Sequence, residues 1–316
     1  MNTEKKPISH LSSALANIRL TQQQQQQQQP TNTDNGPSNP LTSPQAVDRV
    51  AQYRENLPTE GVSLFSHRSA PNGFKIAVIL SELNIKYKTF YLDFAKNEQR
   101  SPYYAEINPN ARVPTIIDHD NNDHAVWESG AIVIYLCQRS GIDSPLWSDD
   151  FIEQSSINSW LFYQASGHAP MIGQALHFRY FHTQVIPSAI ERYTHEVRRV
   201  YAVIEMRLAE NRETMNAERA TSTMGNTPID CSMSSMQSDN GKDQLIGDSD
   251  RDYFDTPVWL FGGRITVADL SFVTWNHVVD RIGISLENEF PEVYRWTKHM
   301  LERPRVSRAL AGLESD

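Results

Sequence analysis

The feature that most constrains the fold is a change in periodicity, from mixed strand-like and helix-like segments to helix-like segments alone. Between residues 61 and 141, apolar residues recur either at the spacing of strands or at the spacing of helices. The order is strand, helix, strand, then strand, strand, helix, over residues 61–67, 73–83, 86–94, 112–119, 124–129 and 130–141. After Pro145 the patterns are helical, over residues 151–167, 188–210 and 265–283. The chain is therefore predicted to hold a small α/β domain followed by an all-helical domain.

The order of the first six segments resembles that of thioredoxin. A thioredoxin-like domain is accordingly expected over residues 61–143 and an all-helical domain over residues 144–316. Thr266 with Asp269 three residues later is a variant of the capping box and predicts the start of a helix. Residues 213–252 lack aromatic side chains and are rich in Ser, Thr, Asn and Gly, so a flexible insert is predicted there. Its position suggests a cap over the cleft between the domains.

Residues 1–60 differ in kind from the rest of the chain. They contain eight consecutive glutamines at 22–29, and only 15 of the 60 are apolar. Such a segment cannot bury enough surface to offset the entropy of ordering it, so a disordered tail is predicted. The tail is either an inert polar segment or a route to self-assembly, because glutamine side chains can stack as amide ladders. A short apolar stripe at Leu11, Leu15 and Ile18 is either a docking helix or a fluctuating turn.

Charge and cysteine content narrow the class of protein. The formal net charge is −9, and the tail is neutral, so the acidic balance belongs to the remainder of the chain. An acidic body argues against direct nucleic-acid binding, which needs a basic stripe. The two cysteines are too few for a disulfide framework, and neither a signal peptide nor a membrane-spanning apolar run is apparent. A cytoplasmic protein is the simplest interpretation.

The turn at residues 70–73, between the first strand and the first helix, is a candidate reactive site. A strand that ends on a helix N-terminus presents free N–H groups and a positive dipole, which favour an anion or a thiolate. Ala70, Pro71, Asn72 and Gly73 form the turn, and none of them offers a hydroxyl or a thiol. Nearby, Ser69 is the better hydroxyl candidate, because Ser66 lies on the strand and is expected to be structural.

Three further motifs accompany that turn: PNARVP at 109–114, WESG at 127–130 and TVAD at 266–269. Together they resemble the glutathione transferase superfamily. The resemblance implies a cis Val113–Pro114 bond, with backbone beside Val113 that pairs with the cysteinyl part of glutathione. It also implies that Glu128 neutralises the α-ammonium of the γ-glutamyl group, while Ser129 and the adjacent helix N–H groups receive its α-carboxylate. Arg112 would add a polar contact. Taken alone, a Glu–Ser pair is an ordinary helix cap.

Asn72 occupies the place where transferases of this superfamily usually carry Tyr, Ser or Cys. Its amide can donate one hydrogen bond to a thiolate, assisted by the helix dipole. The bound glutathione would then be the nucleophile, which is sufficient for reduction of peroxides or disulfides. We therefore expect Asn72 to be catalytic in weak redox chemistry, and we do not expect an efficient conjugating transferase.

Longer blocks, including LFSHRSAPNGFK and GHAPMIGQALHFRYFH, resemble the yeast regulators of nitrogen catabolite repression, a branch of this superfamily that includes a prion protein. This implies a homodimer that holds GATA-type transcription activators in the cytoplasm while good nitrogen sources last. It also implies glutathione-dependent peroxidase or disulfide reductase activity. The alternative is a glutathione-dependent oxidoreductase or transferase that serves mainly in detoxification and oxidative stress defence.

The remaining reactive side chains are expected to be structural. His168, His177 and His182 lack the spacing and the companions of a metal site, so no metal is expected. They are predicted to line the interdomain cleft with Tyr163, Phe178 and Tyr180. Cys137 falls in an apolar run and is expected to be a core thiol, and Cys231 lies in the insert.

Overall fold

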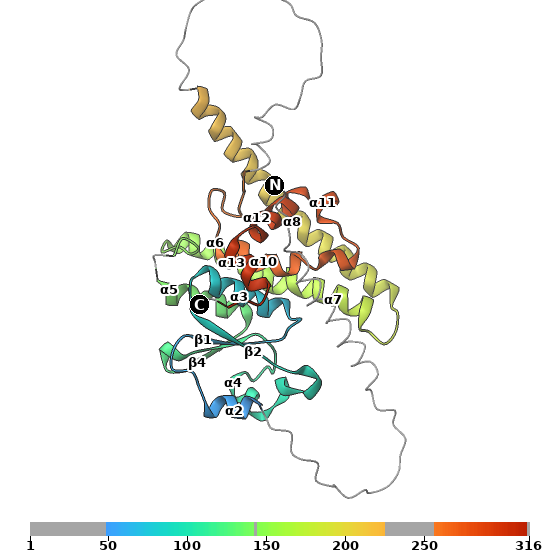
Figure 1. Cartoon of the computed structure of the whole chain (residues 1–316). Coiled ribbons are helices and arrows are strands. Elements are labelled where there is room, and N and C mark those ends of the chain that lie inside the picture. The colour runs from blue at the N-terminus through green and yellow to red at the C-terminus, as the bar shows by residue number, and fades with distance from the viewer. Residues whose placement is uncertain (1–48, 142–143, 225–255, 315–316) are drawn as a thin grey trace, which may run out of the picture.

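The computed structural model describes residues 49–141, 144–224 and 256–314, in which a small sheet domain lies against a helical domain (Figure 1). The sheet has the order β2-β1-β3-β4. β1 pairs in parallel with β2 and antiparallel with β3, and β3 pairs antiparallel with β4. The strands are β1 (Val62–Ser66), β2 (Tyr87–Tyr91), β3 (Thr115–Asp118) and β4 (His124–Trp127). The predicted thioredoxin-like fold is confirmed.

Both faces of the sheet are covered, and strand alternation decides which side chains face which helices. Leu64 and Ile116 enter the large core on the side of α3 (Pro71–Glu82) and α5 (Ser129–Ser140). Their neighbours Phe65 and Ile117 enter a second cluster on the opposite face. That cluster also contains residues of α2 (Arg49–Glu55) and α4 (Pro102–Ile107). Short 3₁₀ turns complete the domain: η1 (Phe94–Lys96), η2 (Glu98–Arg100) and η3 (His119–Asn121).

The boundary predicted for the disordered tail, residue 60, is wrong, because the helix α2 lies within residues 1–60. Val50 is fully buried, and the Tyr53 ring meets the Phe65 ring edge-on at a centroid distance of 5.0 Å. The Tyr53 hydroxyl also lies 3.2 Å from Nε2 of His119. These few side chains complete the second apolar cluster, which a composition averaged over 60 residues conceals. The glutamine tract and the stripe at Leu11, Leu15 and Ile18 fall outside the described residues.

The second domain is helical, as predicted. Its elements are α6 (Phe151–Tyr163), the π-helical turn η4 (Gln164–His168), α7 (Ala169–Tyr180), α8 (Pro187–Met224), α10 (Val267–Asn276), η5 (Val279–Ile282), α11 (Leu286–Glu289), α12 (Pro291–Leu301) and α13 (Pro304–Leu310). None of the helices within the described residues is long and apolar enough to cross a membrane.

α8 continues into the region predicted as an insert, so the prediction is wrong for residues 213–224. Two side chains immediately before residue 213 hold the helix to the rest of the domain. The Asn211 amide donates to the carbonyl oxygen of Trp259 over 2.8 Å, and the Arg212 guanidinium pairs with the Glu292 carboxylate at 2.9 Å. No Gly or Pro interrupts the helix before Met224. Residues 225–252 of the predicted insert fall outside the described residues.

The cap predicted at the start of α10 is present and deeply buried. Oδ2 of Asp269 accepts from the backbone N–H of Thr266 over 2.8 Å, while Oδ1 accepts from the backbone N–H of Leu260 and from the indole of Trp296. The Asp269 side chain is fully buried, and this burial raises the pKa of its carboxyl. One carboxylate therefore joins the loop before α10, the helix itself and α12.

α3 lies between the sheet and the helical domain, where it packs against α10 and α13 (Figure 1). At its C-terminal end, the buried Glu82 carboxylate accepts two hydrogen bonds from Arg303, at 2.9 and 2.6 Å. Near its N-terminal end, Lys75 donates to Gln164 of η4 over 2.8 Å. Since α3 begins at the candidate reactive turn, contacts from the helical domain reach that turn directly.

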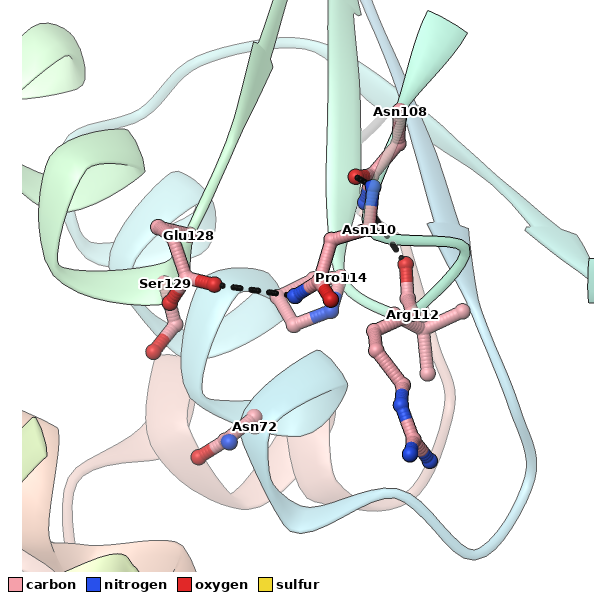
Figure 2. Close-up of a pocket in the computed structure, with 8 residues that line it drawn as sticks. Asn72, Asn108, Asn110, Arg112, Pro114, Glu128 and Ser129 are labelled. Atoms are coloured by element: carbon pink, nitrogen blue, oxygen red, sulfur yellow. Dashed lines mark hydrogen bonds between the residues drawn. The ribbon is translucent and has the colours of Figure 1, made fainter. Parts of the chain in front are cut away.

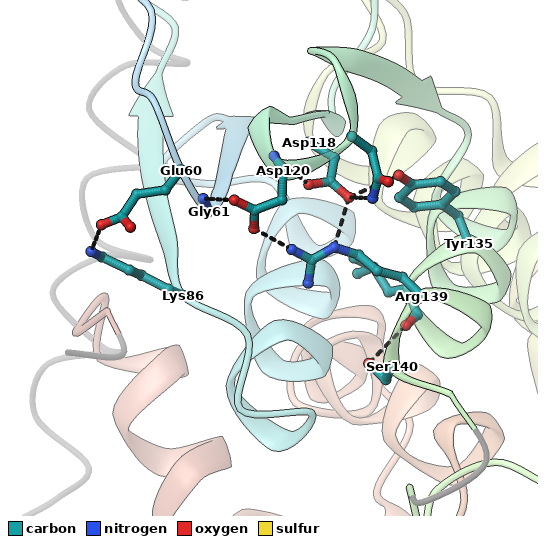
Figure 3. A network of polar contacts seen from close by, with 10 residues as sticks. Glu60, Gly61, Lys86, Asp118, Asp120, Tyr135, Arg139 and Ser140 are labelled. Atoms are coloured by element: carbon teal, nitrogen blue, oxygen red, sulfur yellow. Dashed lines mark hydrogen bonds and ion pairs between the residues drawn. The ribbon is translucent and has the colours of Figure 1, made fainter.

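A polar network fixes α5 to the end of β3 (Figure 3). The Arg139 guanidinium lies 2.7 Å from Asp118 and 2.6 Å from Asp120, and the Tyr135 hydroxyl donates to Asp118 over 2.8 Å. Burial alone would raise the pKa of Asp118. Hydrogen bonds from Asn121 and Tyr135, together with the Arg139 charge, hold that pKa below its usual value. The network sets the direction of α5 and thus the place of Ser129 at its first turn.

Candidate functional site

The predicted site residues meet in one pocket at the edge of the sheet domain. It has a volume of about 250 Å³ and is lined by Asn72, Asn108, Asn110, Arg112, Val113, Pro114, Glu128 and Ser129. Figure 2 shows Pro114 between Glu128 on one side and Arg112 on the other, with Asn72 below. All five residues predicted from the sequence are therefore brought together, although they come from three separate segments of the chain.

The first wall of the pocket is the loop that leads into β3. The Val113–Pro114 peptide bond is cis, as the resemblance implies. The Asn108 amide donates to the carbonyl oxygen of Arg112 over 2.8 Å and to Oγ1 of Thr115 over 2.9 Å, and the Tyr104 hydroxyl also donates to the Arg112 carbonyl. Because these buried groups hold the loop on both sides of the proline, the backbone at Val113 is presented to the pocket in a fixed orientation.

The second wall is the junction of β4 and α5. Glu128 is the N-cap residue of α5 and has a φ of +69°, a left-handed conformation that is costly for a residue with a side chain. Its side chain is exposed and accepts from the Asn110 amide over 3.2 Å. Ser129 is buried at the first position of the helix, where backbone N–H groups lack helical partners. The junction therefore places a negative side chain beside an anion-binding helix end.

The floor is the turn at the start of α3. Gly73 packs so close to β1 that a Cβ built on it would lie 1.9 Å from Oγ of Ser66, which makes glycine necessary here. Ser66 is buried, as predicted for a structural residue. The Ser69 hydroxyl lies 2.7 Å from Nδ1 of His67, which also accepts from the Ser69 backbone N–H, so the hydroxyl proton is directed at the imidazole. Asn72 is the remaining polar group of this turn that lines the pocket.

The Asn72 side chain is held from the helical domain. The indole Nε1 of Trp275, in α10, donates to Oδ1 of Asn72 over 2.8 Å. An indole N–H can only donate, so it selects the amide oxygen and leaves the amide N–H groups for other partners. Asn72 is thereby oriented as a donor, which is the role expected of it toward a thiolate.

A buried lysine lies one turn below the floor. Lys75 has no exposed surface, and its ammonium donates to the neutral amide oxygen of Gln164. Desolvation lowers the pKa of Lys75 to about 7, opposed by the negative charge of Glu128. A lysine that loses its proton near neutrality is therefore buried between the pocket and the helical domain.

The prediction that the histidines line the interdomain cleft needs correction at His168. None of the three lines the pocket. His168 is fully buried in the helical domain, where Nε2 lies 3.0 Å from the amide oxygen of Asn276, and burial lowers its pKa to about 3. His177 and His182 pack together beside Phe178, whose ring stacks on Tyr193 of α8. His168 is the last residue of the π-helical turn η4, which joins α6 to α7 and buries this side chain in the helical domain, whereas the His177 side chain is exposed.

Two other groups were assigned from the sequence. Cys137 is a buried free thiol, as predicted, and burial raises its pKa to about 12, so it is unreactive. Cys231 falls outside the described residues. Among the described residues, no group of three or more His, Cys, Asp or Glu side chains could hold a metal ion.

Sequence reasoning missed Asn108, Asn110 and Trp275. Asn108 could have been found, since an asparagine before a proline-containing turn commonly bonds the backbone two residues on, as Asn108 does with Asn110. Trp275 gave no signal, because it lies 203 residues from its partner Asn72. The pocket thus contains a carboxylate, the N-terminus of α5, the backbone peptide group at Val113 and an amide donor. Such a set suits a small zwitterionic peptide with a thiol.

Comparison with known proteins agrees with this geometry. Residues 60–138 match the family described as "Glutathione S-transferase, N-terminal domain", and residues 251–304 match "Glutathione S-transferase, C-terminal domain". The chain is 53% identical over 319 residues to Protein URE2 of Debaryomyces hansenii, a match that covers 98% of this chain and 97% of the relative. It is also 53% identical over 313 residues to Protein URE2 of Candida albicans, covering 96% of this chain and 86% of the relative.

Solved structures give the same result. A structure of Ure2p in complex with glutathione matches with a TM-score of 0.70 and 51% identity, covering 83% of this chain and 99% of that chain. The nitrogen regulation fragment of the yeast prion protein Ure2p matches with a TM-score of 0.68 and 52% identity, covering 81% and 99%. Fold and site thus define the class as a two-domain protein of the glutathione transferase type. Within that class, the chain belongs to the URE2 family.

Proposed function

We propose that the pocket binds glutathione. The observation that carries the proposal is the convergence of Glu128, Ser129 and Asn72 on one cavity of suitable size. Glu128 meets the α-ammonium of the ligand, Ser129 and the α5 N-terminus receive its α-carboxylate, and the backbone at Val113 pairs with the cysteinyl unit. Arg112, on the exposed rim, offers a polar contact to the part of glutathione beyond its γ-glutamyl and cysteinyl units. The relative solved with glutathione supports this assignment.

The bound thiol would react as its thiolate, stabilised by the Asn72 amide and the N-terminus of α3. With a hydroperoxide, the thiolate sulfur attacks the distal oxygen and the O–O bond breaks. The alkoxide leaves and takes a proton from water, and a glutathione sulfenic acid forms. A second glutathione displaces hydroxide from that sulfur to give glutathione disulfide and water. With a protein or small-molecule disulfide, the same thiolate gives a mixed disulfide, which a second thiol resolves.

Glutathione-dependent reduction of cumene hydroperoxide and of a cysteinyl–glutathione mixed disulfide tests this activity in the full chain. Turnover is expected for the natural chain, and Asn72→Ala should lower it about tenfold, which corresponds to one hydrogen bond to a charged group. Glu128→Ala should raise the glutathione concentration needed for half-maximal rate. Turnover no greater than that of free glutathione would overturn the enzymatic proposal and leave a binding site.

We further propose that the chain is a cytoplasmic regulator of nitrogen catabolite repression, which holds a GATA-type transcription activator out of the nucleus while good nitrogen sources last. Support comes from its full-length similarity to URE2 proteins and from its acidic body, which suits contact with a DNA-binding partner better than with DNA. The alternative, a detoxification oxidoreductase or transferase, is favoured by the complete ligand framework of the pocket.

Expression in a yeast strain that lacks its own regulator separates these two proposals. Retention of a fluorescent GATA activator in the cytoplasm on good nitrogen sources is expected for the natural chain and also for Asn72→Ala. Resistance of the cells to hydroperoxide is expected to fall only with Asn72→Ala. Nuclear activator in every strain would overturn the regulatory proposal, whatever the peroxide result.

A homodimer is also proposed, and α6 supplies the support. Phe151, Ile152 and Phe162 are 77%, 69% and 64% exposed, and the two phenylalanines lie three helical turns apart on one face. Large apolar side chains exposed along one helix are typical of an interface. Sedimentation equilibrium should give twice the chain mass, and Phe162→Glu should shift it to the mass of a single chain. Self-assembly through the glutamine tract at 22–29 stays a proposal for residues that the structure leaves undescribed.

A further inference from the structure

The contact between Trp275 and Asn72 joins the two domains at the reactive turn. Asn72 is the second residue of α3, and Trp275 lies near the end of α10, which packs along α3. The indole is partly buried against the main core, so its plane is held by neighbouring side chains. Its N–H donates to Oδ1 of Asn72 over 2.8 Å. This hydrogen bond comes from the helical domain, yet Trp275 does not line the pocket.

The chemistry of the two groups fixes the orientation of the amide. Rotation of an asparagine amide by half a turn exchanges its oxygen and its nitrogen at little cost in an exposed site. Ala70, the N-cap residue of α3, has no side chain that could hold Asn72. An indole N–H has no acceptor capacity, so only the oxygen can face Trp275. The two amide protons are then left for the pocket.

Orientation decides whether Asn72 favours or opposes a thiolate. With the nitrogen toward the pocket, the amide donates to the sulfur anion. In the reversed orientation, the carbonyl oxygen would face the sulfur, and its partial negative charge would disfavour ionisation. The sign of the contribution made by Asn72 therefore depends on a residue 203 positions away in the sequence.

We propose that Trp275 is a positioning residue, which locks the Asn72 amide so that it donates to the thiolate of bound glutathione. The inference rests on the proposed glutathione site and extends it into the helical domain. Trp275 acts through Asn72 and has no contact of its own with the ligand. Loss of the indole N–H should thus change thiol ionisation and turnover while glutathione affinity, set by Glu128 and Ser129, stays the same.

The test is a double-mutant cycle of Trp275→Phe and Asn72→Ala, read out by the pKa of the bound thiol. That pKa comes from thiolate absorbance near 240 nm against pH, with glutathione saturating the full chain. Trp275→Phe should raise the thiol pKa by at least half a unit and lower kcat at neutral pH about three- to tenfold, with KM for glutathione within about twofold. In the Asn72→Ala background it should change neither. Asn72→Asp, which keeps an acceptor for the indole but has no donor, should raise the thiol pKa at least as much as Asn72→Ala.

The controls separate this inference from general damage and from failure of the proposed function. Trp160→Phe, a partly buried tryptophan of α6 away from the pocket, should change none of these quantities. An effect of Trp275→Phe that persists in the Asn72→Ala background, or no effect at all, would overturn the positioning role. If the natural chain binds glutathione with an unshifted thiol pKa and no turnover, the proposed activity fails. The effect of Trp275 on the thiolate fails with it, and exchange of the Trp275 indole proton in the free chain, expected to be slower than in Asn72→Ala, then tests whether the Trp275–Asn72 hydrogen bond itself is present.

Discussion

The two domains contribute to the pocket in different ways. Every residue that lines it belongs to the thioredoxin-like domain, and each stands at a turn, a cap or the cis proline. The helical domain reaches the same site indirectly, through Trp275 on Asn72 and Gln164 on Lys75. Thus one domain supplies the groups that line the candidate pocket, while the other contacts side chains of α3 at that pocket and one turn below it. If the pocket binds glutathione as proposed, ligand binding and control of its chemistry are separated along the chain, although they meet on one helix.

If this division holds, the largest effect on folding should come from the helical domain. Asp269→Ala removes one buried carboxylate and leaves donors of Leu260, Thr266 and Trp296 without partners. Each such loss costs about 1–3 kcal/mol, so the free energy of unfolding should fall by about 3–5 kcal/mol in urea denaturation. Asp150→Ala, which removes an exposed cap of α6, is the matched control and should cost about 1 kcal/mol. Equal costs for the two variants would contradict the special role of Asp269.

In the thioredoxin-like domain, by contrast, a substitution in the pocket is expected to weaken ligand binding and to leave the free energy of unfolding unchanged. Glu128→Gln keeps the shape and the hydrogen bond from Asn110 but removes the negative charge proposed to meet the ligand ammonium. Calorimetry should show glutathione affinity weaker by about tenfold to a hundredfold, the range for a charge-assisted hydrogen bond. The free energy of unfolding should stay within about 0.5 kcal/mol, because the side chain is exposed. Glu106→Gln, an exposed carboxylate on α4 outside the pocket, should change neither. An affinity loss of similar size there would point to long-range charge instead of contact.

The third effect, the smallest for each pH unit, concerns a residue at the boundary between the domains. The pKa of Lys75 is lowered by burial to about 7, whereas a lysine in the unfolded chain has a pKa near 10.4. Between these two values the unfolded state binds more protons, so stability should rise with pH from about 7 to about 10. The slope from this group is at most about 1.4 kcal/mol per pH unit.

Urea denaturation at pH 7, 8 and 9 measures that slope, and Lys75→Met should remove it. Lys86→Met is the matched control, because Lys86 is an exposed lysine paired with Glu60 (Figure 3). Its slope between pH 7 and 9 should equal that of the natural chain. A Lys75→Met chain that keeps the full slope would show that other groups carry the pH dependence.

Much of the thioredoxin-like domain could be predicted, since its signals are short-range. The strand spacing, Gly73 in its close packing, the proline at 114 and the Glu128–Ser129 junction each depend on a few neighbouring residues. The predictions were wrong where they rested on the average composition of a long segment, as at Val50 in α2 and at residues 213–224 of α8. It also placed His168 in a cleft, although the π-helical turn directs this side chain into the helical core.

By itself, the sequence determined the order of the four strands with α3 and α5, the capping of α10 and the five side chains of the candidate site. Only the tertiary structure decided which way the Asn72 amide faces and why Lys75 lies close to losing its proton at neutral pH. The physical reason is that backbone conformation follows from steric preferences of adjacent residues, whereas amide orientation and proton affinity follow from whichever groups packing brings alongside. Trp275 and Gln164 come alongside α3 only when the helical domain is in place.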